Sequence, residues 1–336
     1  MPVRVLTVDD SPFFLEVLAG IINSEPGLTV VGSARDGAEA LEKIMALAPD
    51  VVTLDVEMPV MDGLGVLERM MSTRPTPTIM VSAHTRRASA ATVRALRLGA
   101  CDFVEKPERA LRESREALRA ELVDKIKAIG SWHPAAPAVT QEAADAPYSG
   151  RRPRIVVIGA STGGTTVLAR ICEALPRIMR ATVVVVQHLP GLYTHEFAKH
   201  LSETARCPVH LGRDGALVER GVFIAPGGFH LTVHGTSLRV SRGEPVNRCI
   251  PSIDVTMSSV ARGFGPAACG VLLTGMGRDG VNGIAEIKAG GGATMAQDEA
   301  TSAVFGMPRA AIAAGTVDFV LSDKAICRGL AEMVGE

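Results

Sequence analysis

The chain has 336 residues, a length that predicts two domains rather than one. Hydrophobic residues make up 47% and charged residues 21%, as in ordinary globular proteins, which excludes a chain that is disordered throughout. The 35 basic and 36 acidic residues give a formal net charge of −1, which does not favour a broad basic face for nucleic acid. The acidic N-terminal segment does not fit a signal peptide, and no apolar run reaches the ~18 residues of a membrane span. We therefore expect a cytoplasmic protein that binds no nucleic acid and is not a membrane protein.

The six cysteines are scattered and contain no CxxC pair. This spacing fits neither a zinc site nor a disulfide framework. We predict that most of these thiols are small, buried apolar side chains.

Residues 1–128 alternate short apolar strands with amphipathic helices, which predicts a doubly wound, flavodoxin-like (βα)5 domain. The expected strands are 4–8, 28–32, 51–54, 78–81 and 102–104, and the expected helices are 12–24, 37–47, 64–72, 86–98 and 108–128. The strands are apolar on both faces, as in a buried parallel sheet. The last helix carries Glu108/Arg112 and Glu121/Lys125 at the spacing of helical ion pairs, which indicates a solvated face.

Residues 129–153 lose this periodicity and are rich in proline and alanine, which predicts a linker containing the single tryptophan, Trp132. Alternation resumes over 154–336. There we expect a second doubly wound α/β domain, whose mostly parallel sheet contains an inserted β-hairpin formed by the short segments between 222 and 241. The expected helices are 163–175, 191–203, 252–262, 280–289 and 322–333.

Charged and polar residues end the predicted strands of the first domain: Asp9 and Asp10, then Asp55, Ser82 and Lys106. Ligands of open α/β sheets bind at the carboxyl ends of the strands, so these groups should converge. Three carboxylates repel one another, and a hard cation with oxygen ligands, Mg²⁺, would stabilise them. An aspartate beside Mg²⁺ can attack a phosphoryl group, with Lys106 and the Ser82 hydroxyl binding the phosphoryl oxygens. One such residue would be an ordinary loop residue, but the same pattern at four strand ends indicates a site.

The segments VDDS (8–11), LDVEMPVMDG (54–63), VSA (81–83) and EKP (105–107) resemble those of response-regulator receiver domains. The resemblance implies that Asp55 accepts the phosphoryl group and that Asp10, Asp55 and the Glu57 backbone carbonyl hold Mg²⁺, with Asp9 supporting the ion. It also implies that Ser82 and Lys106 respond to phosphorylation. Val60 departs from the arginine of many family members, which leaves the phosphoryl chemistry intact but alters the surface.

Three strand ends of the second domain carry Ser161, His188 and Asp279. If these strands are parallel neighbours, the three side chains meet at one edge of the sheet. A serine needs a base to become a nucleophile, histidine titrates near neutral pH, and a carboxylate fixes the tautomer of the imidazole. Backbone N–H groups at the following turn can stabilise an oxyanion.

Two glycine-based alternatives apply to the segment GASTGG (159–164). A phosphate-binding loop is disfavoured because the segment has neither the GxGxxG spacing nor a Walker lysine. The G-x-S-x-G pattern at 159–163 suggests an α/β-hydrolase, but those enzymes order their triad Ser, Asp, His. Here the aspartate follows the histidine, so we reject that fold and retain the chemistry.

Other candidates for the base and the acid are weaker. His230 and His234 share one strand face and could be metal ligands, but without a third ligand a solvated hairpin face is the better interpretation. Asp254 begins a predicted helix and is interpreted as a cap or first-turn acid. His188 and Asp279 are therefore preferred.

The segments GASTGG, QHLP (187–190), IAPGG (224–228), PVNRCIPSID (245–254), VLLTGMGRDG (271–280) and AQDEATSAVFGMP (296–308) resemble the catalytic domain of chemotaxis-type protein-glutamate methylesterases. That family hydrolyses glutamyl methyl esters on chemoreceptor cytoplasmic helices, and many members deamidate receptor glutamines. The resemblance implies Ser161 as nucleophile, His188 as base and Asp279 as its orienting acid, with Thr162 and Met276 near the oxyanion. It implies hydrolysis without a cofactor and Mg²⁺ for receiver phosphorylation.

The resemblance also implies partners and regulation. Methyl-accepting chemoreceptors would be the substrate and a chemotaxis histidine kinase the phosphodonor, and we expect a monomer. In the family the unphosphorylated receiver covers the catalytic face until phosphorylation relieves it. Three alternative functions are disfavoured. An inactive phosphorylation-controlled binding protein would not need the complete set of Ser161, His188 and Asp279. A DNA-binding response regulator would need a basic recognition helix, which the sequence lacks, and a nucleotide-dependent oxidoreductase does not fit the glycine spacing.

Overall fold

A computed structural model describes residues 1–83, 85–107, 112–130 and 152–335. The chain forms two compact units, Met1–Pro134 and Ala135–Glu336. Most of the predicted linker 129–153, with Trp132, lies outside the described residues, as do Glu108, His84 and His133. The linker boundaries therefore stay a prediction. No described helix is long and apolar enough to cross a membrane.

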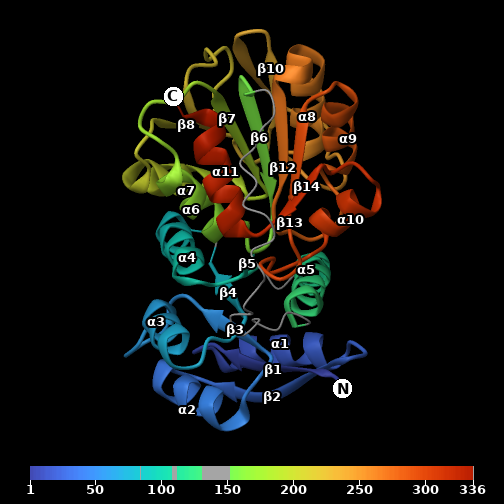
Figure 1. Cartoon of the computed structure of the whole chain (residues 1–336). Helices are drawn as coiled ribbons and strands as arrows, with labels where there is room; N and C mark the ends of the chain where they lie inside the picture. Colours follow the sequence, from blue (N-terminus) through green and yellow to red (C-terminus); the bar gives the residue numbers. More distant parts are fainter. Residues whose placement is uncertain (84, 108–111, 131–151, 336) are drawn as a thin grey trace. The chain divides into compact units, whose positions relative to one another are not determined.

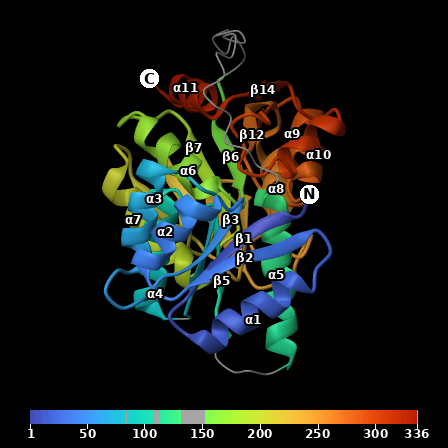
Figure 2. The same cartoon turned by 90° about the horizontal axis from the view of Figure 1, so that it is seen from below.

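The first unit is a parallel five-stranded sheet in the order β2-β1-β3-β4-β5. The strands are β1 (Val3–Val8), β2 (Leu28–Ala34), β3 (Val51–Asp55), β4 (Thr78–Ser82) and β5 (Asp102–Glu105). The helices are α1 (Pro12–Asn23), α2 (Gly37–Leu47), α3 (Gly63–Thr73), α4 (Arg86–Leu98) and α5 (Arg112–Gly130). Figure 2 shows α1 and α5 on one side of the sheet and α2 and α3 on the other. The predicted (βα)5 fold is confirmed.

Side-chain caps start the helices just beyond the functional strand ends. Ser11 caps α1 by accepting from Phe14 N, with proline in the first turn, and Asp62 caps α3 by accepting from Gly65 N. Strands β3 and β4 are buried along their whole length, which fits their mostly apolar sequences, VVTLD and TIMVS. The predicted Glu121–Lys125 pair forms at 2.7 Å.

The second unit contains a seven-stranded sheet in the order β14-β13-β12-β6-β7-β9-β8, with every pairing parallel. Its strands are β6 (Ile155–Ala160), β7 (Thr182–Gln187), β8 (Val209–Leu211), β9 (Gly221–Ile224), β12 (Ala268–Leu272), β13 (Ala293–Gln297) and β14 (Phe319–Leu321). The chain runs outward from β6 in both directions, so the strand order reverses at β6 (Figure 1). Such a reversal opens a crevice at the carboxyl ends of β6 and its neighbours.

The helices of this unit are α6 (Gly164–Ala174), α7 (Gly191–Thr204), α8 (Ile253–Phe264), α9 (Val281–Ala289), α10 (Met307–Ala313) and α11 (Asp323–Val334), with a short 3₁₀ turn at Gly265–Ala267. Helices α6, α7 and α11 cover one face of the sheet, and α8, α9 and α10 cover the other. The core is formed by the fully buried strands β6, β7 and β12 and the apolar faces of the helices against them.

The predicted hairpin exists, but it lies outside the main sheet. Strands β10 (His230–His234) and β11 (Ser237–Ser241) form a separate antiparallel pair. The hairpin packs on α8, where Thr256 Oγ1 donates to Leu231 O at 2.7 Å and Val233 N donates to Ser259 Oγ at 3.0 Å. The expectation of a hairpin inserted within the sheet is therefore wrong in its placement, because α8 supplies the apolar face on which it is buried. Strand β8 and helix α10 were not predicted.

Candidate functional site

Three carboxylates converge at the edge of the first sheet, as predicted. Asp9 and Asp10 follow β1 and Asp55 ends β3, and their oxygen atoms lie within 4.8 Å of one another. Asp9 is fully buried and Asp55 nearly so, whereas Asp10 is exposed. A set of oxygen ligands open to water on one side fits the coordination of Mg²⁺.

Lys106 lies in the middle of the acidic groups. Its Nζ is 2.7 Å from Asp9 Oδ2 and 2.7 Å from Asp55 Oδ2. Burial lowers the pKa of Lys106, but Asp55 and Asp9 outweigh burial and raise this pKa above its ordinary value. Burial raises the pKa of Asp55 to about 6, with Lys106 opposing and Asp9 adding to the shift. At pH 7 Asp55 is therefore an ionised carboxylate held by an ammonium group.

The loop after β3 is tightly packed around Asp55. Glu57 N donates to Asp55 Oδ1 at 3.3 Å, and a Cβ on Gly63 would lie 2.0 Å from the Asp55 carbonyl oxygen. Only glycine allows α3 to begin so close to the strand end. Val60 in this loop is fully exposed and has a positive φ of 68°, a costly conformation for a β-branched residue.

The structure places Ser82 at the same edge but in contact with helix α4. The fully buried Ser82 hydroxyl is hydrogen-bonded to the Thr92 hydroxyl at 2.8 Å. Thr92 was not singled out from the sequence, because a threonine inside an amphipathic helix gives no signal of its own. The pair links the carboxyl end of β4 to α4.

In the second unit, Ser161 lies where β6 turns into α6. Ser161 N donates to Thr274 O at 3.0 Å, and Ser161 O accepts from Gly164 N at 2.8 Å and Gln187 Nε2 at 3.0 Å. The turn passes through Gly163 at a φ of 78°, where a Cβ would lie 2.5 Å from Ala303 Cβ. The nucleophile candidate is thus fixed by contacts from β7 and from the loop after β12.

His188 follows β7 and Asp279 lies in the loop after β12, the two strands on either side of β6, and their side chains meet. His188 Nε2 lies 2.9 Å from Asp279 Oδ2, and His188 N donates to Ala160 O at 3.1 Å, beside Ser161. Burial lowers the pKa of His188, but Asp279 and then Cys249 outweigh burial and raise this pKa to about 9. Burial raises the pKa of Asp279, but hydrogen bonds from His188 and Asn247 hold this pKa below its ordinary value.

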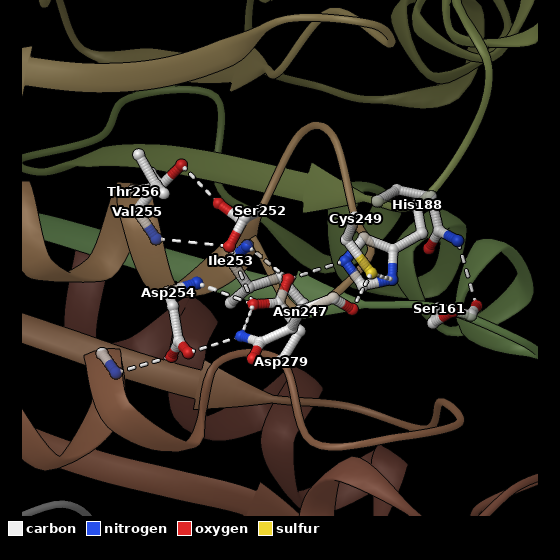
Figure 3. Close-up of polar contacts among 12 residues, drawn as sticks. Ser161, His188, Asn247, Cys249, Ser252, Ile253, Asp254, Val255, Thr256 and Asp279 are labelled. Atoms are coloured by element: carbon white, nitrogen blue, oxygen red, sulfur yellow. Dashed lines mark hydrogen bonds and ion pairs between the residues drawn. The ribbon is translucent and has the colours of Figure 1, made fainter. Parts of the chain in front are cut away.

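The carboxylate of Asp279 is held by the N-terminus of α8 (Figure 3). It accepts from Ile253 N at 2.7 Å, from Ser252 Oγ at 2.8 Å and from Asp254 N at 3.3 Å. Free N–H groups and the helix dipole at this end favour a negative charge. Asp279 is therefore a fixed, ionised partner for the imidazole.

The hydrogen bond to Asp279 determines the roles of the two ring nitrogens of His188. A carboxylate can only accept, so Nε2 carries the proton and Nδ1 carries the lone pair when the ring is neutral. Nδ1 faces Cys249 Sγ at 3.6 Å. Among the described contacts no hydrogen bond joins the Ser161 hydroxyl to His188, and such contacts often form only with substrate bound.

Comparison with known proteins decides the family. Residues 156–330 match the CheB methylesterase family model, and residues 5–119 match that of the response regulator receiver domain. The chain is 42% identical to the protein-glutamate methylesterase/protein-glutamine glutaminase of Symbiobacterium thermophilum over 100% of this chain and 98% of that protein. The chain belongs to the CheB methylesterase family.

Other relatives agree with this assignment. The protein-glutamate methylesterase/protein-glutamine glutaminase of Chromohalobacter salexigens is 44% identical over 93% of this chain and 91% of its own. The crystal structure of the Thermotoga maritima CheB methylesterase catalytic domain superposes with a TM-score of 0.53 at 38% identity, covering 54% of this chain and 99% of that one.

The two oxyanion candidates lie in different segments: Thr162 directly follows Ser161 in the turn between β6 and α6, and Met276 lies in the loop after β12. Thr162 is buried and its carbonyl accepts from Thr274 Oγ1 at 2.9 Å, while Met276 is exposed. That loop is held by Met307 N, which donates to Gly275 O at 2.9 Å. The oxyanion role of Thr162 and Met276 stays a prediction.

His230 differs from the prediction of a solvated face. It is 6% exposed, its Nδ1 accepts from Ser252 N at 3.2 Å and its Nε2 lies 3.0 Å from Glu244 O. Only His234 is on the exposed surface, because α8 and the loop before it cover the first half of the hairpin. In this CheB-family chain His230 supports the segment that holds Asp279.

Asp254 is a first-turn acid of α8, as predicted, and it has further contacts. Its carboxylate accepts from Gly283 N at 2.7 Å and from Asn247 Nδ2 at 2.8 Å. The same Asn247 amide donates to Asp279 Oδ1 at 2.9 Å, so it joins two buried carboxylates. Asn247 adopts a φ of 53° to do this.

Sequence reasoning missed Asn247, Ser252 and Cys249. All three lie in the segment PVNRCIPSID, in which only Asp254 has a position, at the start of a predicted helix, that marks it from the sequence. Four of the six cysteines are buried, in agreement with the prediction, and Cys249 is one of the two that are partly exposed. A loop without periodicity gave no means of placing it against His188.

Proposed function

We propose that this chain hydrolyses glutamyl methyl esters on the cytoplasmic helices of chemoreceptors and that phosphorylation of its receiver domain activates the reaction. The observation that carries the proposal is the His188–Asp279 pair at 2.9 Å beside the Ser161 turn, at the point where the strand order reverses. The curated relatives bear the name protein-glutamate methylesterase/protein-glutamine glutaminase. The match of residues 5–119 to the receiver family model supports regulation by phosphorylation.

The tautomer of His188 sets the direction of proton transfer. Nε2–H is held by Asp279, so the base is Nδ1. Ser161 Oγ attacks the ester carbonyl while Nδ1 takes its proton, and the same proton then passes to the departing methanol. Water deprotonated by Nδ1 next attacks the glutamyl-serine ester, and Ser161 recovers its proton as the free glutamate leaves. No cofactor takes part in these steps.

The negative charge of each tetrahedral intermediate needs donors near Ser161. We assign this role to the backbone around Thr162 and Met276, since both loops are anchored to the Ser161 turn through Thr274. Fixed donors cost no reorganisation during the reaction.

A second activity at the same site is deamidation of receptor glutamines, as the names of the curated relatives include a glutaminase. An amide differs from the ester in its leaving group, and ammonia departs only when His188 delivers a proton to it. The reaction is expected to be slower than ester hydrolysis. Ammonia release from a glutamine-bearing receptor, lost in Ser161→Ala, tests it.

For the receiver we propose Asp55 as the phosphoryl acceptor and a chemotaxis histidine kinase as the donor. Asp10, Asp55 and the Glu57 carbonyl would hold Mg²⁺ with Asp9 behind them, and the ion supplies neutralisation of the phosphoryl charge. Lys106, now bound to both Asp9 and Asp55, would bind a phosphoryl oxygen, and Ser82 would leave Thr92 to do the same. On phosphorylation, Lys106 and Ser82 would therefore exchange their present hydrogen-bond partners for phosphoryl oxygens, and this change would be the switch. We propose a cytoplasmic monomer as the working form.

Methanol release from methyl-labelled receptor membranes tests the catalytic half. Wild type is compared with Ser161→Ala and with Ser202→Ala, a matched control that removes an exposed hydroxyl from α7. We expect release from wild type and from the control, and a loss of at least about 10³-fold in Ser161→Ala. Equal release from all three proteins would remove Ser161 as the nucleophile.

A further inference from the structure

The base nitrogen of His188 faces a thiol. Cys249 Sγ lies 3.6 Å from His188 Nδ1, while Asp279 Oδ2 lies 2.9 Å from Nε2 (Figure 3). The ligand atoms that His188, Cys249 and Asp279 offer lie within 4.8 Å of one another. The catalytic reaction as derived above makes no use of this sulfur.

The separation of the two atoms fits a shared metal ion. In a tetrahedral zinc site with Zn–S of about 2.3 Å and Zn–N of about 2.0 Å, the sulfur and nitrogen ligands are about 3.5 Å apart. Cys249 Sγ and His188 Nδ1 are 3.6 Å apart, close to this separation. The two atoms are therefore near enough to share one ion once the thiol turns toward the in-plane direction of Nδ1.

The other side of the imidazole has the arrangement found behind zinc-binding histidines. Such a histidine donates its second N–H to a carboxylate, which fixes the ring and makes the free nitrogen more basic. Asp279 accepts from Nε2 and is itself held by Ser252 and the α8 N-terminus. The hydrogen bond to Asp279 thus leaves Nδ1 as the ring nitrogen available to an ion.

Ions in solution can reach the pair. The His188 side chain is 15% exposed and Cys249 is partly exposed. By contrast, burial raises the pKa of the Cys172 and Cys269 thiols to about 12, and these side chains are closed to solvent. A thiolate with an imidazole selects Zn²⁺ rather than Mg²⁺, which prefers oxygen.

We propose that Cys249 and His188 form a Zn²⁺ site, with Asp279 orienting the histidine and water completing the coordination, and that zinc at this site stops hydrolysis. On binding, the thiol releases its proton to solvent and the Nδ1 lone pair is donated to the metal. Nδ1 then cannot accept the Ser161 proton. The metal-binding half is independent of the proposed esterase function, and the inhibition half rests on it.

Binding is tested with Co²⁺ as a spectroscopic probe on the full chain. We expect thiolate-to-cobalt charge-transfer absorption in wild type that Zn²⁺ displaces, and its loss in Cys249→Ser. Cys327→Ser is the matched control, since it removes the other partly exposed thiol, on α11. Absorption that persists in Cys249→Ser, or that disappears in the control, would overturn the site.

Inhibition is tested by methanol release without phosphodonor, so that ions bound near Asp55 do not enter the measurement. Each protein is compared with its own rate in a metal chelator. We expect Zn²⁺ to inhibit wild type and Cys327→Ser, the chelator to restore activity, and Cys249→Ser to need at least about tenfold more Zn²⁺. Cobalt binding without zinc inhibition would refute the inhibitory role, and equal inhibition of all three proteins would refute the site. Absence of any metal-free activity would instead contradict the proposed function, while the cobalt spectra would still test the site.

Discussion

The raised pKa of His188 predicts that hydrolysis has an alkaline optimum. A general base acts only in its neutral form, and the pKa of His188 rises from 6.5 to about 9 in the folded chain. This rise corresponds to a preference for the imidazolium of roughly 3 kcal/mol. At pH 7 only about one molecule in a hundred holds the neutral base, so the rate should rise about tenfold per pH unit from 7 until it levels near 9.

Two substitutions separate the causes of that shift. Asp279 and Cys249 both raise the pKa of His188 against the effect of burial. Cys249→Ala should therefore move the rise of the rate with pH to lower pH and increase the rate at pH 7. Asp279→Asn should move this rise to still lower pH. The maximal rate of Asp279→Asn should fall by about 10³ to 10⁴-fold because the imidazole loses its orienting partner.

The assay is the initial rate of methanol release from methyl-labelled receptor between pH 6 and 10, with the Ser161→Ala rate subtracted to remove hydroxide-catalysed hydrolysis. A rate independent of pH between 7 and 9 would refute the reasoning. So would a rate–pH profile of wild type with its midpoint at or below pH 6.5, or a midpoint that moves to higher pH in Cys249→Ala.

Three further predictions concern other parts of the molecule. Burial raises the pKa of Asp55 from 3.8 to about 6, so the folded receiver should lose stability as the pH rises from about 4 to 6. Asp55→Asn should remove this pH dependence and stabilise the domain at pH 7 by about 1–3 kcal/mol, measured by thermal unfolding. A stability–pH profile that Asp55→Asn leaves unchanged would contradict this prediction. A Cβ on Gly275 would lie 2.7 Å from Ser161 Cβ, so Gly275→Ala should reduce methanol release about 10²-fold, whereas Gly329→Ala, in open space on α11, should leave it unchanged. Asn247→Ala removes one donor from each of two buried carboxylates and should lower the free energy of unfolding of the second unit by about 2–4 kcal/mol in urea; full stability would show that the amide is not needed there.

The parts of the site that could be predicted lie at the ends of buried parallel strands. Asp55 ends such a strand, and Lys106, Ser161 and His188 each follow one. The geometry of a parallel sheet brings all the carboxyl ends of its strands to one edge. Asp279 required one more step, because it follows β12 after a loop of several residues. Strand periodicity and side-chain chemistry were sufficient for these placements.

The remaining features depend on contacts between segments that are distant in sequence. Cys249 reaches His188 from a loop without periodicity, and Asn247 joins two carboxylates through a positive φ that no sequence pattern announces. His230 is buried because α8 packs over the hairpin, a tertiary effect that strand alternation does not encode. Helix α10 spans only seven residues, too few for a helical period to stand out.

The most direct test of the whole account couples the two units in one measurement. Methanol release is followed in wild type and in Asp55→Asn, each with and without a small-molecule phosphodonor and Mg²⁺. We expect the phosphodonor to accelerate wild type at least about fivefold and to leave Asp55→Asn at its basal rate. Equal acceleration of both proteins, or none in wild type whose Asp55 is shown by mass to be phosphorylated, would contradict it.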